Sequence, residues 1–308
     1  MIVTVTCNPA VDVTYRVDSL APAEVHRVDS VAERPGGKGV NVSRVLRQLG
    51  VESVATGFAD AQFGATVEAL GVRAAFVPAL PKVRRTLVVH GDEATTSFWE
   101  PGLPAAHEAD DALADRVAGL LVNASALVVS GSLPPGADPR LPSRLADLAQ
   151  AAGVPVVLDL DGPALGAAAH GSGAVLVPNL NELAGLVGGD AHADVVAAAR
   201  DLSARSGAPV VVTLGADGML AVSGAECWHA EAPERVVGNP TGAGDAAAAA
   251  IARGLGDGAG WPQIVADATA LSAAAVVAPV AGEVDLASYE EWRHRVDVRA
   301  VRPATAGR

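Results

Sequence analysis

Residues 239–245 read Asn-Pro-Thr-Gly-Ala-Gly-Asp and lead directly into a run of alanine and isoleucine at 246–252. Glycine lets the backbone turn tightly and approach a ligand closely, and alanine has the highest helix propensity. The stretch therefore predicts a loop that feeds a helix N-terminus, where unpaired N–H groups and the helix dipole favour an anion. A carboxylate beside an anion is unfavourable for binding alone, so Asp245 suits a base that takes a proton from a hydroxyl attacking a phosphoryl group. A glycine-rich turn before a helix is also common as plain structure, so this interpretation depends on the rest of the chain.

The composition predicts an α/β fold. Of the 308 residues, 50% are hydrophobic and only 3% aromatic, so the core consists mainly of Ala, Val and Leu. Such a core suits parallel strands that are buried on both faces and flanked by closely packed helices. From residue 105 onward, strand and helix patterns alternate, which predicts right-handed βαβ crossovers and a parallel sheet. A chain of this length accommodates either one α/β domain with an insertion or two domains.

Charge and cysteine content argue against several classes of function. The net charge of −13 argues against a nucleic-acid partner, because phosphate backbones require basic surfaces. Cys7 and Cys227 are the only cysteines, and they show neither metal-ligand spacing nor a disulfide framework. The first residues read as a strand rather than a secretion signal, and the most apolar late run, 268–281, is too short to span a bilayer. We therefore expect a cytoplasmic protein without a membrane partner.

Two segments interrupt the α/β pattern. Residues 12–34 and 84–100 alternate between apolar and polar, a period-two pattern typical of short antiparallel strands. The second segment reads as a hairpin around Gly91-Asp92-Glu93. We expect the two segments to form a small β-sheet lid over the active site. The α/β core is then expected to comprise residues 1–11, 35–83 and 101–308.

Candidate substrate contacts lie in and near the predicted lid. Asp12 follows the first predicted strand, where ligands collect in open α/β sheets, although taken alone it reads as a surface turn residue. Lys38 and Asn41 belong to a glycine-rich segment (RPGGKGVNV) that exposes backbone amides but lacks the spacing of a Walker P-loop. They are candidate sugar or phosphate contacts, with a solvated lysine and a helix-start asparagine as the structural alternative. Arg84 and Arg85 open the predicted hairpin, where one could hold a substrate phosphate while the other is solvated.

Asn179 and Glu182 are candidate ligands of a metal ion. They lie three positions apart at a predicted helix start, so both side chains could face one ion or its water shell. Mg²⁺ keeps several waters and needs few protein oxygens, so two such groups suffice. Thr213 and Gly215 follow the next strand and could contact the phosphates or ribose of a nucleotide, although an ordinary hairpin explains their spacing as well.

Taken together, these motifs resemble those of the ribokinase-like (pfkB) carbohydrate kinases from end to end. The resemblance is greatest to the branch of 1-phosphofructokinases and tagatose-6-phosphate kinases. The motifs that carry it, in family order, are Asn8-Pro9-Ala10 with Asp12, Gly36-Gly37-Lys38-Gly39-Val40-Asn41-Val42, Glu100-Pro101-Gly102, residues 130–136, Pro178-Asn179 with Glu182, and residues 241–245. The resemblance implies a ribokinase-like three-layer α/β/α sandwich with a mainly parallel sheet and a β lid, and ATP and Mg²⁺ as cosubstrates.

The resemblance also implies roles for individual residues. Asp245 matches the catalytic base, beside an anion hole formed by Gly242, Ala243 and Gly244. The sugar site is expected to use Arg84 for the existing phosphate, together with Asp12, Gly37, Lys38, Asn41, Glu100 and Ser130. The nucleotide is expected at Thr213, Gly215, Gly218 and Thr241, with Mg²⁺ held through water by Asn179 and Glu182. Lid sheets of two subunits often pack together in such kinases, so a homodimer is expected.

Three departures from the family pattern concern the substrate. Val177 stands where a lysine usually precedes Pro-Asn, and His26 stands where asparagine is usual. Residues 239–241 resemble the tagatose-6-phosphate kinases more than the 1-phosphofructokinases. We therefore expect an ATP-dependent kinase that phosphorylates a hydroxyl of a ketohexose phosphate, namely tagatose 6-phosphate, fructose 6-phosphate or fructose 1-phosphate.

Two alternatives remain open at this point. One is a kinase of an unphosphorylated sugar or nucleoside, against which the positive charges of Lys38, Arg84 and Arg85 argue. The other is a catalytically silent sugar-phosphate sensor built on the same fold, which would have no need of the base at Asp245.

Overall fold

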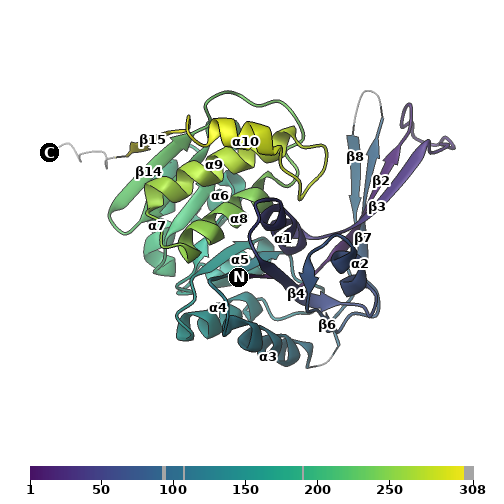
Figure 1. The fold of residues 1–308 in the computed structure, drawn as a ribbon, viewed down its shortest axis with the longest axis horizontal. Coiled ribbons are helices and arrows are strands. Elements are labelled where there is room, and N and C mark those ends of the chain that lie inside the picture. The colour runs from purple at the N-terminus through teal and green to yellow at the C-terminus, as the bar shows by residue number, and fades with distance from the viewer. Residues whose placement is uncertain (92–94, 107, 189–190, 302–308) are drawn as a thin grey trace.

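The computed structural model describes residues 1–91, 95–106, 108–188 and 191–301. Within these residues, a large central sheet is covered by helices on both faces, and a small second sheet projects from one side (Figure 1). This three-layer α/β/α arrangement with a separate small sheet confirms the fold class expected from the sequence.

The central sheet has 11 strands within the described residues, in the order β15-β14-β13-β12-β11-β10-β9-β1-β4-β5, with β6 paired to β4. Its parallel part comprises β1 (Ile2–Thr6), β4 (Ser53–Ala59), β5 (Arg73–Ala74), β6 (Val77–Pro78), β9 (Ala126–Gly131), β10 (Val156–Leu160), β11 (Val175–Leu176) and β12 (Val210–Thr213). Three antiparallel strands extend one edge: β13 (Met219–Ser223), β14 (Glu226–Glu231) and β15 (Asp297–Ala300). The sequence analysis did not single out β15, although its four residues, DVRA, alternate between charged and apolar side chains.

Strand β1 shows why the sheet is buried on both sides. All five of its residues are buried, and Ile2 pairs in parallel with Ser53 of β4 and Ala126 of β9. Successive side chains of a strand point to opposite faces. Val3 and Val5 therefore pack into the core under one helical layer, whereas Ile2 packs under the other.

The helices form two layers (Figure 1). One layer comprises α3 (Ala109–Leu121), α4 (Leu141–Ala151), α5 (Gly162–Ala168), α6 (Leu180–Val187) and α7 (Val195–Ser206). The other comprises α1 (Lys38–Gln48), α8 (Ala243–Gly256), α9 (Trp261–Val277) and α10 (Leu286–Trp292). Helix α2 (Phe63–Ala69) packs on β4, and a 3₁₀ turn, η1 (Gly215–Asp217), follows β12. Residues 246–252 of α8 are fully buried, because their small side chains let α8 pack closely against α1, α9 and the sheet.

The second sheet, called the lid sheet below, has the strand order β3-β2-β7-β8. Its strands are β2 (Ala10–Arg16), β3 (Ser30–Gly36), β7 (Arg84–His90) and β8 (Thr95–Trp99). Both predicted antiparallel pairs, β2–β3 and β7–β8, are present, and a parallel β2–β7 pairing joins them. The turn predicted at Gly91-Asp92-Glu93 lies mostly outside the described residues. None of the described helices combines the length and apolar character needed to cross a membrane.

Candidate active site

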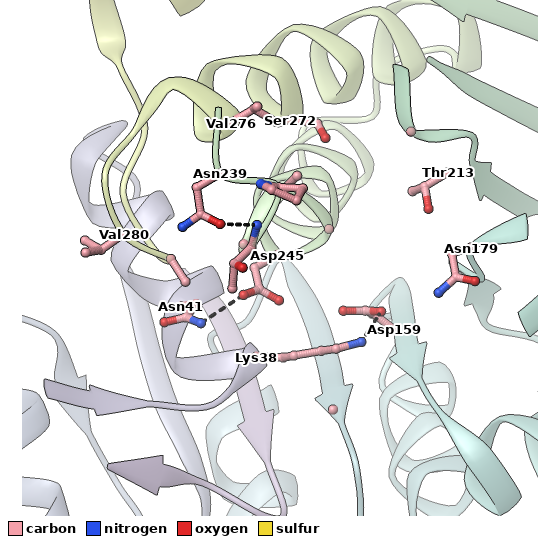
Figure 2. Close-up of a pocket in the computed structure, with 18 of the residues that line it drawn as sticks. Lys38, Asn41, Asp159, Asn179, Thr213, Asn239, Asp245, Ser272, Val276 and Val280 are labelled. Atoms are coloured by element: carbon pink, nitrogen blue, oxygen red, sulfur yellow. Dashed lines mark hydrogen bonds and ion pairs between the residues drawn. The ribbon is translucent and has the colours of Figure 1, made fainter. Parts of the chain in front are cut away.

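A cavity of about 1800 Å³ lies between the carboxyl ends of the central strands and one face of the lid sheet. Ligands of open α/β sheets bind at this end of the strands, because the loops that follow the strands converge there. Figure 2 shows the part of the cavity where β10, α1 and the start of α8 meet. The cavity therefore joins the core and the lid in one site.

The turn before α8 presents free backbone donors to this cavity. Gly242 adopts a left-handed conformation with φ of 92°, and a Cβ added there would lie 2.9 Å from Cα of Ala281. The Thr241 amide donates to Oδ1 of Asn239 at 3.0 Å. The amides of Gly244 and Asp245 donate to no group among the described residues. Unpaired amides at a helix start favour an anion, so the turn has the donors that the predicted anion site would need.

Asp245 is buried beside this turn, and its pKa lies near neutrality. Its side chain accepts a hydrogen bond from Nδ2 of Asn41 on α1 at 2.9 Å (Figure 2). Burial, followed by the charge of Asp159, raises the pKa of Asp245 to about 7, although the Lys38 charge and the Asn41 hydrogen bond oppose the shift. A carboxyl group with a pKa near neutrality can both accept and release a proton at physiological pH.

Lys38 forms an ion pair with Asp159, which the sequence analysis did not single out. The Nζ–Oδ1 distance is 3.0 Å, and the Asp159 side chain is 7% exposed. Burial lowers the pKa of Lys38, but the charges of Asp159 and Asp245 raise it more, so the ammonium group stays protonated. The sequence could have indicated Asp159 as a site residue, because it lies near the carboxyl end of β10, where ligands of open α/β sheets bind.

Asn179 and Glu182 form a capping box at the start of α6. Oδ1 of Asn179 accepts from the Glu182 amide at 2.9 Å, and Oε2 of Glu182 accepts from the Asn179 amide at 2.8 Å. The spacing of three residues therefore stabilises the start of α6, because it lets the two side chains cap each other's backbone amides. Burial is the main cause that raises the pKa of Glu182. Oδ2 of Asp159 is buried without a partner in the described part of the chain, so carboxylate oxygens remain that fit a hard cation such as Mg²⁺.

The lid sheet separates the two candidate arginines. Successive residues of a strand face opposite sides, and Arg84 lines the cavity whereas Arg85 pairs with Glu33 at 3.3 Å outside it. Nη1 of Arg84 donates to the Glu100 carbonyl at 2.9 Å, and its buried Nε has no partner among the described residues. Burial is the main cause that raises the pKa of Asp12, which accepts a hydrogen bond from Thr86 across the lid sheet.

The cavity gathers all but one of the residues expected in the site. Its lining includes Asp12, Gly37, Lys38, Asn41, Arg84, Glu100, Asn179, Glu182, Thr213, Gly215, Gly218, Thr241, Gly242, Ala243, Gly244 and Asp245. Ser130 is the exception, because its hydroxyl is buried in β9 and the cavity is lined instead by Gly131 and Ser132. Lining residues that the sequence analysis missed include Arg34, Arg44, Asp159 and Ser272.

Comparison with known proteins gives consistent results. A sequence profile of the pfkB family carbohydrate kinases matches residues 3–285. Phosphofructokinase-2 from Escherichia coli, in complex with potassium, is 27% identical, with a TM-score of 0.86 over 95% of this chain and 98% of that chain. A possible 1-phosphofructokinase from Thermotoga maritima is 25% identical, with a TM-score of 0.86 over 98% of this chain and 100% of that chain. Arabidopsis thaliana ribokinase, complexed with ribose and ATP, is 20% identical with a TM-score of 0.70 over 94% and 97% of the two chains, a likeness of fold alone.

Proposed function

Because the chain belongs to the pfkB family of carbohydrate kinases, we propose that it is an ATP-dependent kinase that phosphorylates a hydroxyl of a ketohexose phosphate. The family and the phosphofructokinase branch agree with the motifs of the sequence. Asp245 is the observation that carries the proposal. It is a buried carboxyl group with a pKa of about 7, placed at a helix start where the amides of Gly244 and Asp245 have no partner among the described residues.

In the proposed reaction, Asp245 accepts the proton of the sugar hydroxyl while that oxygen attacks the γ-phosphorus of ATP, and ADP leaves as the bond from that phosphorus to the bridging oxygen breaks. The free amides of Gly244 and Asp245 would stabilise the negative charge of the transferring phosphoryl group, whereas the Ala243 amide, also expected in the anion hole, already donates to the Pro240 carbonyl at 3.2 Å. Asn41 holds the Asp245 carboxylate in place through its hydrogen bond of 2.9 Å. Fixed donors in a site closed to water contribute most to such a reaction, because they need no reorganisation when charge develops.

We propose Asp159, Asn179 and Glu182 as the residues that would hold Mg²⁺, in part through water. A bound Mg²⁺ would neutralise negative charge on the phosphates of the nucleotide. The nucleotide itself is proposed to contact Thr213, Gly215, Gly218 and Thr241, which all line the cavity. A phosphate bound at the Gly242 turn would then lie beside Asp245.

The phosphorylated class of substrate is proposed from the position of Arg84. Its side chain lines the cavity, and Nη1, bonded to the Glu100 carbonyl, is the one guanidinium nitrogen with a partner among the described residues. Arg–phosphate contacts use several guanidinium donors at once. We expect Arg84→Ala to raise KM for the sugar phosphate by about 10- to 100-fold, because a charge-assisted contact is worth about 1.5–3 kcal/mol.

Arg85→Ala is the matched control, since Arg85 neighbours Arg84 but lies outside the cavity lining. It should leave KM for the sugar unchanged in steady-state kinetics. Equal KM values for wild type and Arg84→Ala would instead favour a substrate without a phosphate group.

The substrate class is tested by ADP release with Mg²⁺ and ATP across fructose 1-phosphate, fructose 6-phosphate, tagatose 6-phosphate, fructose and ribose. Turnover with one or more of the sugar phosphates, and little with free sugars, is expected. Activity confined to free sugars would instead indicate a kinase of unphosphorylated sugars, of the ribokinase type. Binding of a sugar phosphate without ADP release on any sugar would support the sensor alternative.

The pKa of Asp245 predicts the pH dependence of turnover. Its deprotonated form accepts the proton, so activity is lost as the pH falls below the folded-state pKa of about 7. We expect kcat/KM to fall about tenfold per pH unit on the acid side and to level off above neutrality. A flat profile between about pH 5.5 and 8, with the protein folded throughout by circular dichroism, would contradict a base of this pKa.

We also propose that two chains pair through the lid sheet and its β2–β3 loop. Exposed large hydrophobic side chains gather there on the side away from the cavity or in the loop, namely Leu20, Val25, Val28, Val31 and Phe98, whereas the exposed Trp99 lines the cavity. Such a concentration of exposed apolar groups is typical of an interaction surface. Light scattering should then give twice the chain mass of 30.8 kDa, and Phe98→Asp should shift the mass toward the monomer. A monomeric wild-type protein would rule this pairing out.

A further inference from the structure

One carboxylate connects three separate parts of the site. Oε1 of Glu283, in the loop between α9 and α10, accepts from Nη1 of Arg34 at 2.7 Å and from Nη2 of Arg44 at 3.2 Å. Arg34 belongs to β3 of the lid sheet, and Arg44 belongs to α1 of the core. Glu283 therefore bridges the lid sheet, the core helix and the loop that carries it.

The same loop lies directly behind the turn before α8. Nη1 of Arg44 donates to the Ala281 carbonyl at 2.8 Å, and a Cβ at Gly242 would lie 2.9 Å from Cα of Ala281. Gln48 of α1 adds two further bonds, from Nε2 to the Gly282 carbonyl at 2.8 Å and from the Val284 amide to Oε1 at 3.1 Å. The loop is thus held by α1 and supports the turn that presents the free amides.

The two halves of the bridge differ in their exposure to solvent. The Arg44 side chain is 10% exposed, whereas Arg34 is 42% and Glu283 is 35% exposed. An ion pair in contact with water is weak and is screened by salt. The Arg44–Glu283 contact is therefore the fixed half, and the Arg34–Glu283 contact is the half that can open when the lid sheet moves.

We propose that Glu283 is a positioning residue that couples the lid sheet, through Arg34, to the loop supporting the turn before α8. The inference rests on the proposed kinase function and adds to it a link between the lid and the phosphoryl-binding turn. When Arg34 is bound to Glu283, β3 and the 279–284 loop are held together, and the lid sheet shields the cavity from water. Water competes with the sugar as phosphoryl acceptor, so a loosened lid favours ATP hydrolysis over sugar phosphorylation.

The test measures ATP hydrolysed per sugar phosphorylated in Arg34→Ala, Arg34→Lys and Glu283→Gln. We expect Arg34→Ala and Glu283→Gln each to raise the hydrolysed fraction by about fivefold, with Glu283→Gln also lowering kcat by about tenfold because it weakens both contacts. Arg34→Lys should recover most of the wild-type ratio, since it keeps a positive charge. High salt should raise the hydrolysed fraction of the wild type toward that of Arg34→Ala, because salt screens the ion pair.

Arg85→Ala is the matched control. Its ion pair with Glu33 has similar exposures, 47% and 48%, but it lies within the lid sheet and does not reach the core. If Arg34→Ala and Arg85→Ala give the same hydrolysed fraction, the proposed coupling through Glu283 is wrong. If Arg34 instead binds the substrate directly, Glu283→Gln would free it for that contact and leave the hydrolysed fraction unchanged, which would also overturn the proposal.

Hydrogen exchange without any substrate separates this inference from the kinase assignment. Amides of β3 and of residues 279–284 should exchange faster in Arg34→Ala and Glu283→Gln than in wild type or Arg85→Ala. Faster exchange in a protein that phosphorylates no sugar would uphold the mechanical link while the proposed function fails. Unchanged exchange in an active kinase would reject the link alone.

Discussion

Replacement of Asp245 by asparagine is expected to lower kcat by about 10²- to 10⁴-fold, the contribution typical of a positioned general base. Asparagine has nearly the same shape as aspartate, and its Oδ1 can still accept the hydrogen bond that Asn41 donates at 2.9 Å. It cannot take a proton from the sugar hydroxyl. Steady-state kinetics should show the loss, and calorimetric titration should show ATP binding largely retained. Near-wild-type turnover would remove Asp245 from the catalytic role.

The same variant is expected to be more stable than wild type at alkaline pH. The pKa of Asp245 is raised from 3.8 to about 7 on folding, mainly because burial disfavours the charged form. The unfolded chain thus loses its proton before the folded chain does, and the free energy of unfolding falls as the pH rises from about 4 through 7. Asparagine does not titrate, so this loss disappears in the variant.

Thermal unfolding at two pH values checks the sign. Tm of Asp245→Asn should exceed that of wild type by several degrees at about pH 8.5, and the difference should shrink as the pH approaches 4. A variant less stable than wild type at about pH 8.5 would contradict the unfavourable burial of the charged carboxylate. Loss of activity together with a gain in stability would also exclude misfolding as the cause of the lost turnover.

The sequence predicts those parts of the site that local motifs encode. Residues 239–245 predict a turn and a helix start, and alternation in 84–99 predicts a hairpin, because glycine, alanine and period-two patterns act within a few positions. Contacts between distant residues leave no such pattern. Lys38 pairs with Asp159 across 121 positions, and Arg34 pairs with Glu283 across 249 positions. Only the tertiary fold brings these groups together.

Two further cases show where a local sequence pattern does not decide what a residue does. The Asn179 and Glu182 spacing predicts two oxygens near one ion, but the structure shows that the same spacing forms a capping box at the start of α6. Arg84 and Arg85 are indistinguishable as neighbouring cations in the sequence. Strand pairing decides between them, since the register of β7 with β2 sets which side chain faces the cavity.

Replacement of Gly242 by alanine is expected to remove most turnover by disturbing the geometry of the anion site. Gly242 has a φ of 92°, and the added Cβ would lie 2.9 Å from Cα of Ala281. Backbone atoms cannot give way as a flexible side chain can, so either the turn or the 279–284 loop must shift. The free amides of Gly244 and Asp245 would then point away from the phosphoryl group. Loss of one such donor typically lowers kcat by about 10²- to 10³-fold.

Gly258→Ala separates this geometric effect from backbone strain alone. Gly258 follows the other end of α8 with a φ of 70°, and no atom lies within 4 Å of the Cβ that alanine would add. Its cost should be confined to the strained conformation, about 1–3 kcal/mol of stability, with kcat unchanged. If both glycine variants lost the same activity in proportion to Tm, destabilisation of α8 would explain the result. A loss confined to Gly242→Ala, with KM for the sugar near its wild-type value, would place the effect on the transferring phosphoryl group, since a transition-state interaction lowers kcat and leaves ground-state binding intact.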